Sequence, residues 1–86
     1  MNISKSEQRI LHALAQGGCI RYDRAANGKI TRADCVTHDG SILSGCTVEM
    51  TSRLRRRRWI VSRESAPYRI SPAGLRAVRA QLDNRV

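Results

Sequence analysis

The sequence predicts an α+β fold in one domain, with the element order α-β-β-(β)-α-β-β-α. Eighty-six residues, of which 41% are hydrophobic, suffice for one modest core and no second one. Apolar residues recur at helical spacing in three segments, and short runs of strand-forming residues bounded by turn signals lie between them. Residues 1–86 are therefore expected to form a single domain of helices and antiparallel strands.

The first helix is expected to begin after Ser4. Glu7 follows three residues later, which is the spacing of a capping box, in which each side chain bonds the other residue's backbone N–H. The helix then shows an apolar stripe and ends at Gly17-Gly18; the stripe consists of Ile10, Leu11 and Leu14.

A hairpin is expected next, because Asn27-Gly28 suits a two-residue type I′ turn with positive φ at both positions. Counting back from this turn pairs opposite charges on one face, namely Arg21 with Asp34 and Asp23 with Arg32. The other face gathers Ile20, Tyr22, Ala33 and Cys35.

Asp39-Gly40 predicts a second turn before a short strand at residues 41–43. A strict two-residue turn here would place Val36 and Leu43 on the charged face. The sequence leaves open whether a bulge or an early end of pairing intervenes in residues 36–46.

The second half of the chain predicts a helix, a ribbon and a closing helix. The helix is expected to begin at Ser44 or Cys46 and to run to about Arg57, with an inward stripe of Val48, Met50, Thr51 and Leu54. Residues 59–61 and 68–70 are expected as strands around a turn at residues 65–67. Ser71-Pro72 predicts the start of the last helix, whose buried stripe is Leu75, Val78 and Leu82.

This second half resembles a winged-helix domain. The resemblance lies in Leu54-Arg-Arg-Arg-Arg-Trp-Ile60 and in Tyr68-Arg-Ile-Ser-Pro-Ala-Gly74. It implies a winged-helix-like, nucleic-acid-binding domain whose basic helix enters the major groove and whose ribbon forms the wing. Two features depart from that pattern: a hairpin replaces the helix that normally precedes the recognition helix, and Arg58 stands where glycine often ends it.

Positive charge is concentrated in the same region. Sixteen Lys and Arg residues against seven Asp and Glu give a net charge of +9. Residues 1–46 carry six basic and four acidic side chains, a net of +2, and residues 47–86 carry ten and three, a net of +7. Arginine, which binds phosphate and guanine bidentately, outnumbers lysine 14 to 2. The asymmetry favours a polyanionic partner.

Duplex DNA is the partner expected first. The predicted contacts to base edges and phosphates come from the helix and the ribbon; they are Ser52, Arg53, Arg55, Arg56, Arg57, Arg58, Arg63 and Arg69. Six to eight phosphate contacts would give a log–log salt dependence with a slope of about −5 to −7. The alternative to DNA binding is that these arginines form a solvated helix end and complement the helix dipole.

No catalytic residue, metal ligand or cofactor is expected, so the sequence does not predict an enzyme. The candidate zinc ligands do not form two closely spaced pairs, as zinc sites usually require; they are Cys19, Cys35, His38 and Cys46. The predicted topology also brings no Ser/His/Asp or Cys/His set together for catalysis. No segment approaches the roughly 18 apolar residues of a membrane span, and no apolar signal run begins the chain. A cytoplasmic protein with reduced thiols and no membrane contact is expected.

Both ends of the chain resemble the YjhX family. The matching residues are Asn2-Ile-Ser-x-x-Glu-Gln-x-x-Leu-His-x-Leu-Ala15 and Val78-Arg-Ala-Gln-Leu-Asp-Asn-Arg85. The resemblance implies a small bacterial protein that is the toxin of a toxin–antitoxin pair. It further implies interference with DNA topoisomerase and an acetyltransferase-like antitoxin, and it assigns no site residue.

Two classes of function remain open from the sequence. The first is a DNA-binding module that uses residues 52–58 and the 63–69 ribbon. The second is a protein-interaction module that docks on an acidic patch of topoisomerase or another partner without intrinsic DNA affinity. An RNA-binding regulator would present the same charge, and the sequence does not set the oligomeric state.

Overall fold

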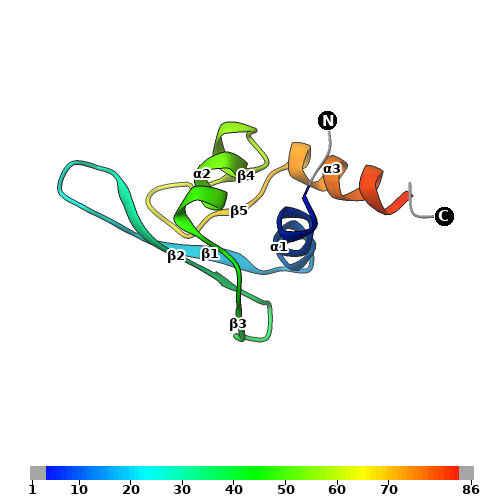
Figure 1. Ribbon diagram of the computed structural model, residues 1–86, viewed down its shortest axis with the longest axis horizontal. Helices are drawn as coiled ribbons and strands as arrows, with labels where there is room; N and C mark the ends of the chain where they lie inside the picture. Colours follow the sequence, from blue (N-terminus) through cyan, green and yellow to red (C-terminus); the bar gives the residue numbers. More distant parts are fainter. Residues whose placement is uncertain (1–3, 84–86) are drawn as a thin grey trace.

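The computed structural model describes residues 4–83, and it describes side chains up to residue 79. Its elements are α1 (Lys5–Ala15), β1 (Cys19–Arg24), β2 (Ile30–Val36), β3 (Ile42–Leu43), α2 (Val48–Arg56), β4 (Ile60–Val61), β5 (Arg69–Ile70) and α3 (Pro72–Asp83). The predicted α+β class is confirmed: β1, β2 and β3 form one antiparallel sheet, and β4 and β5 form another. Figure 1 shows the β1–β2 hairpin reaching away from the helices, with α3 at the opposite end. None of the helices in this part of the chain is long and apolar enough to cross a membrane.

α1 begins with the predicted capping box. The Ser4 hydroxyl accepts the Glu7 N–H at 3.1 Å, and the Glu7 carboxylate accepts the Ser4 N–H at 3.3 Å. The predicted stripe of Ile10, Leu11 and Leu14 is buried. Glu7 is itself only 4% exposed, so its carboxylate lies inside the protein and needs partners there.

The β1–β2 register is confirmed, but the predicted two-residue turn is wrong. Ile20 faces Cys35 and Asp23 faces Arg32, as counted from the sequence. The turn has one residue more: the Ala25 N–H donates to Lys29 O, the Gly28 N–H donates to Ala25 O, and Gly28 has φ 86°. An irregularity between Asp23 and Arg24 compensates for the extra residue. The core face is therefore kept although the turn is different.

Residues 37–41 repeat the same turn. The Thr37 N–H donates to Ser41 O and the Gly40 N–H donates to Thr37 O, with φ 92° at Gly40. The extra residue places Leu43 opposite Cys35, on the core side, and leaves Ile42 69% exposed. The question left open for residues 36–46 is thus answered by a turn one residue longer than the strict two-residue turn, and the short β2–β3 pairing is regular over its two residue pairs.

Tyr68 joins the two sheets. It exchanges two backbone hydrogen bonds with Ile20, each 2.9 Å long, so β1 lies beside the segment that leads into β5. The ribbon itself pairs Ile60 with Ile70 and Val61 with Arg69, which is shorter than the sequence predicted.

α3 begins at Pro72 as predicted. The Ser71 hydroxyl accepts the Gly74 N–H at 3.1 Å and donates to Arg58 O at 2.6 Å, which ties the start of α3 to the end of α2. Val78 is buried and Leu75 is half-buried, whereas the side chain of Leu82 lies outside the described part of the chain. α1 packs against α3, β1 and β5, whereas α2 packs against β2 and β4.

Candidate nucleic-acid interface

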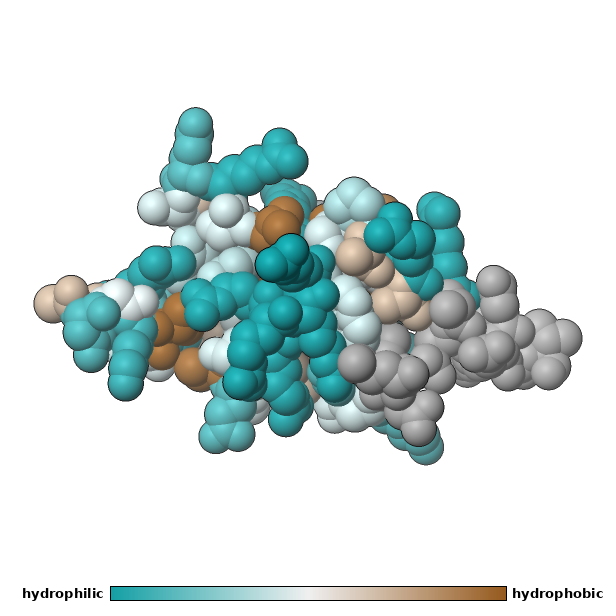
Figure 2. Space-filling view, turned by 90° about the horizontal axis from the view of Figure 1, so that it is seen from above, coloured by the Kyte–Doolittle hydropathy of each residue, from teal (hydrophilic) through white to brown (hydrophobic). Residues whose placement is uncertain are grey.

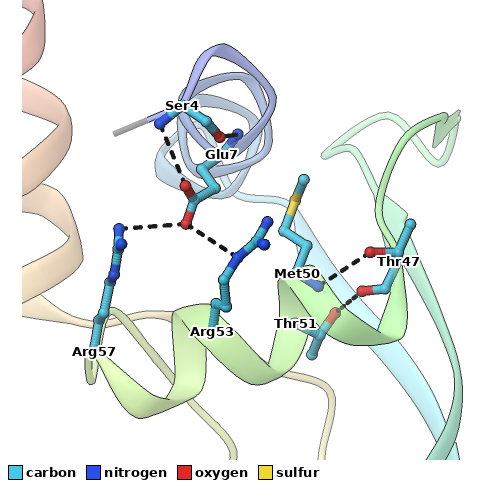
Figure 3. A network of polar contacts seen from close by, with 7 residues as sticks. All are labelled: Ser4, Glu7, Thr47, Met50, Thr51, Arg53 and Arg57. Atoms are coloured by element: carbon cyan, nitrogen blue, oxygen red, sulfur yellow. Dashed lines mark hydrogen bonds and ion pairs between the residues drawn. The ribbon is translucent and has the colours of Figure 1, made fainter. Parts of the chain in front are cut away.

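α2 begins later than the sequence predicted. Its N-cap is Thr47 rather than Ser44 or Cys46: the Thr47 hydroxyl accepts the Met50 N–H at 3.0 Å. The Thr47 carbonyl accepts the Thr51 hydroxyl at 2.9 Å (Figure 3). The inward stripe is largely as predicted, since Met50, Thr51 and Leu54 are buried and Val48 packs partly buried against them. The opposite face of α2 therefore lies towards solvent.

The end of α2 is closed by an arginine in a conformation that favours glycine. Arg58 has φ 61°; its N–H donates to Arg55 O at 2.9 Å, and the Trp59 N–H donates to Leu54 O at 3.1 Å. These two bonds form a Schellman motif, in which the left-handed residue costs about 1 kcal/mol when it is not glycine. The side chain of Arg58 is left exposed beside the helix end.

Two of the predicted DNA-binding arginines face α1. Arg57 Nη1 lies 3.4 Å from Glu7 Oε2, and Arg53 Nε lies 4.0 Å from the same oxygen. Figure 3 shows both side chains rising from α2 towards the Glu7 carboxylate. Because the carboxylate is 5% exposed, two guanidinium groups offset the cost of burying its charge. Arg53 keeps a side-chain exposure of 47%, whereas Arg57 keeps 28%.

Two more contacts show that arginines here also hold the fold together. The Arg57 guanidinium lies 4.9 Å from the centre of the Trp59 ring, a cation–π contact. Arg69 Nη1 donates to Gly17 O at 3.1 Å, which links β5 to the end of α1. The sequence did not signal the Arg69 contact, because Gly17 belongs to a distant segment that only the fold brings near.

The other predicted contact residues remain on the surface. Arg55, Arg56, Arg58 and Arg63 are exposed, Ser52 is half-buried, and none of the four arginines forms an ion pair within the described residues. Figure 2, seen from the α2 side, shows hydrophilic side chains covering the middle of this face. The structure thus leaves four guanidinium groups on α2, its C-terminal end and the ribbon with neither an ion pair nor a hydrogen bond among the described residues, while Arg69 bonds only a neutral carbonyl.

Arg24 lies beside the predicted contact residues although nothing about its position in the sequence indicated this. This residue ends β1, and its guanidinium lies 5.2 Å from the centre of the Tyr22 ring. Arg24 and Arg55 line one cleft of about 350 Å³ between the hairpin, α2 and the β4 side of the ribbon. A basic residue before a hairpin turn carries no signal by itself, because its nearness to α2 depends on how the hairpin packs.

Burial favours the protonated form of two thiols, those of Cys35 and Cys46. Burial raises the pKa of the Cys35 thiol to about 11, and burial also raises the pKa of the half-buried Cys46 thiol. A protonated thiol is a poor nucleophile and metal ligand. Within residues 4–83, no group of three or more His, Cys, Asp or Glu side chains is placed to hold a metal ion.

Known proteins resemble this chain along its whole length. The family described as "Putative toxin of bacterial toxin-antitoxin pair", YjhX toxin, matches residues 1–85. A UPF0386 protein of Beijerinckia indica is 60% identical over 99% of this chain and 100% of its own length. A UPF0386 protein of Caulobacter vibrioides is 57% identical over 100% of this chain and 94% of its own length. No solved structure matches the chain.

Proposed function

The chain belongs to the YjhX toxin family, and we propose that it acts by binding duplex DNA through α2 and the β4–β5 ribbon, without catalysis. The observation that carries the proposal is the set of arginines on α2, its C-terminal end and the ribbon whose side chains have neither an acidic partner nor a hydrogen bond among the described residues: Arg55, Arg56, Arg58 and Arg63. Uncompensated guanidinium groups on one rigid surface attract a polyanion such as DNA.

The order and packing of the elements support a winged-helix-like use of this surface. α2 precedes the β4–β5 ribbon, and the Ile20–Tyr68 bridge adds β1 beside that ribbon. α1 and α3 pack against each other and against β5, which leaves the outer face of α2 uncovered. In this proposal α2 takes the place of the recognition helix and residues 62–67 that of the wing tip.

The salt dependence follows from how many arginines are available. Seven arginines were predicted from the sequence to contact DNA. Three of them, Arg53, Arg57 and Arg69, already have intramolecular partners, so four arginines remain free to contact phosphate. Four phosphate contacts give a log–log slope of about −4, shallower than the slope of −5 to −7 expected from the sequence. A measured slope therefore counts how many of these arginines touch phosphate.

Binding of a short labelled duplex, followed by fluorescence anisotropy between about 50 and 200 mM salt, tests the proposal. The double variant Arg55→Gln/Arg56→Gln is expected to lose about tenfold in affinity and to flatten the slope by about 2. The matched control is Arg76→Gln/Arg79→Gln, which removes two exposed charges from α3 instead. Equal losses for the two double variants would mean diffuse attraction and would rule out α2 as the contact surface.

A second candidate function is docking of an acidic protein. A groove of about 360 Å³ on the outer face of the ribbon combines Val61, Ile70 and Pro72 with Arg63 and Arg69. Val61 is 41% exposed, and an apolar floor with basic edges suits an acidic, partly apolar protein segment. Such a segment could belong to the antitoxin or to the topoisomerase that the family resemblance implies.

The two functions separate with one variant. Val61→Glu places an acidic group in the groove and leaves α2 unchanged. If protein docking is the activity, this variant loses binding to purified topoisomerase or antitoxin in a direct titration, and duplex affinity is negligible for wild type. If DNA binding is the activity, wild-type protein binds the duplex, and Val61→Glu, which adds one negative charge beside the ribbon arginines, lowers that affinity by less than Arg55→Gln/Arg56→Gln does.

A further inference from the structure

The cleft between the hairpin and α2 carries positive charge without a balancing carboxylate. Its two charged lining residues are Arg24 from β1 and Arg55 from α2, and the rest of the lining consists of tyrosine, serine and aliphatic side chains. A neighbouring cleft on the same hairpin differs, because there Arg21 and Arg32 are matched by Asp23 and Asp34. Two like charges that share a cleft without a counter-charge favour a bound anion.

The cleft is also built rigidly. The Tyr22 ring contacts the Tyr68 ring with centroids 4.8 Å apart, and Arg24 lies over Tyr22. The Tyr22 hydroxyl lies 3.0 Å from the Ser62 hydroxyl, which itself donates to Ala66 O; the shared proton is therefore donated by Tyr22. These contacts hold a guanidinium in place before any ligand arrives, which lowers the entropy that binding costs.

Tyr68 supplies an unused hydrogen-bond donor. Its side chain lines the cleft and the residue is 2% exposed, yet its hydroxyl has no hydrogen-bond partner among the described residues. In that part of the chain no side-chain oxygen is both fully enclosed and unpaired. The hydroxyl must therefore be reachable from outside, and the cleft is the open space that Tyr68 lines.

We propose that this cleft binds a phosphate group, with Arg24 and Arg55 neutralising its charge and the Tyr68 hydroxyl donating a hydrogen bond to it. Guanidinium groups and hydroxyl donors together form the usual phosphate-binding set. The inference rests on the proposed function where the phosphate belongs to a bound duplex. A free nucleotide offers the same chemistry.

NMR titration tests the site directly with inorganic phosphate, thymidine monophosphate and, as a phosphate-free control, thymidine. The two phosphates are expected to shift the Tyr68 ring signals and the Arg24 and Arg55 Nε–H signals, and thymidine is not. Arg24→Gln and Tyr68→Phe are each expected to weaken phosphate binding, by about tenfold and by about threefold respectively. Tyr68→Phe leaves the charge and the ring packing unchanged, so its loss cannot come from general electrostatics.

Arg21→Gln is the matched control, because it removes the same charge from the same strand but belongs to the balanced cleft. A loss for Arg21→Gln as large as that for Arg24→Gln, or wild-type binding by Tyr68→Phe, would overturn the proposal. If Tyr68→Phe does not fold, Arg55→Gln decides in its place, since Arg55 is exposed.

Duplex titrations identify the source of the phosphate. If Arg24→Gln and Tyr68→Phe weaken duplex binding as well, the phosphate is that of the DNA backbone. If they weaken binding of the monophosphate alone, the ligand is a free nucleotide. If the wild-type protein binds duplex but no phosphate shifts the cleft signals, this inference fails while the proposed function stands. If phosphate shifts the cleft signals but the protein does not bind duplex, the proposed function fails while this inference stands.

Discussion

Arg57 Nη1 lies 3.4 Å from Glu7 Oε2, and this contact joins the C-terminal end of α2 to the first turn of α1. The same carboxylate caps α1 by accepting the Ser4 N–H and also lies 4.0 Å from Arg53. One buried carboxylate thus contacts three partners and neutralises part of the positive charge of α2. The surface left for a polyanion is accordingly smaller than the run of arginines suggests.

Replacing Glu7 is expected to change stability and DNA affinity in opposite directions. Glu7→Gln keeps an acceptor for the Ser4 N–H but removes the charge that faces two arginines. We expect a loss of about 1–2 kcal/mol in the free energy of unfolding, because both arginines are partly exposed and the pairs are screened. Duplex affinity should rise a few-fold, since Arg53 and Arg57 are released. Urea unfolding and anisotropy measure the two effects.

Glu49→Gln is the control for this variant. Glu49 is an exposed acid in the first turn of α2 and forms no ion pair among the described residues, so its replacement should leave stability within about 0.5 kcal/mol. If Glu7→Gln is as stable as wild type, Glu7 does not fasten α2 to α1.

Arg58→Gly is expected to be more stable than Arg58→Ala by about 1 kcal/mol. Both variants remove the same charge, but only glycine takes φ 61° without steric cost. If the Arg58 side chain contacts phosphate, both variants should lose the same amount of duplex affinity. Thermal unfolding gives the first comparison and anisotropy the second. Equal stability of the two variants would show that the left-handed conformation is not retained in solution.

Gly74→Ala is expected to destabilise the protein, although alanine normally favours a helix by about 1 kcal/mol. A Cβ atom at this position would overlap with Trp59 O and lie 2.8 Å from Ile70 Cγ1, so α3 would have to move away from the ribbon. We expect a loss of more than about 2 kcal/mol in urea unfolding. Arg76→Ala, at an exposed position of the same helix, should change stability by less than about 0.5 kcal/mol.

Cys35 is expected to make stability fall at alkaline pH. Burial raises its thiol pKa from 9.0 to about 11, so the folded state holds the thiol proton more tightly than the unfolded state does. The stability contributed is complete below about pH 9 and is lost as the pH rises towards 11. Urea unfolding across this range measures the slope.

Cys35→Ala is the comparison for the alkaline effect, because it removes the titrating group and should remove its share of the slope. A thiol reagent at neutral pH should also modify half-buried Cys19 well before Cys35, which has 0% exposure. Rapid labelling of Cys35 in the folded protein would contradict its burial.

The hairpins show how far a local pattern can be followed. Alternation of apolar and charged residues predicted the register of Ile20 with Cys35, because a slip of one residue would turn the core face to solvent. The type of turn was not predictable in the same way. A three-residue turn with Gly28 and a compensating irregularity near Asp23 satisfies the same register as the two-residue turn.

The sequence by itself determined the features that depend on a few neighbouring residues. These include the capping box of Ser4 and Glu7 and the start of α3 at Ser71-Pro72, where each bond joins residues three or four positions apart. The concentration of arginine after residue 46 is likewise plain from the sequence.

Only the tertiary structure decided which arginines are available. The sequence does not distinguish Arg53 and Arg57 from Arg55 and Arg56. In the structure, Arg53 and Arg57 lie on the side of α2 that faces Glu7 of α1. Arg24 joins Arg55 in one cleft because the end of β1 lies near α2 in the folded chain. A charge is neutralised or left free by whatever lies within a few ångströms of it, and packing between distant segments sets that neighbourhood.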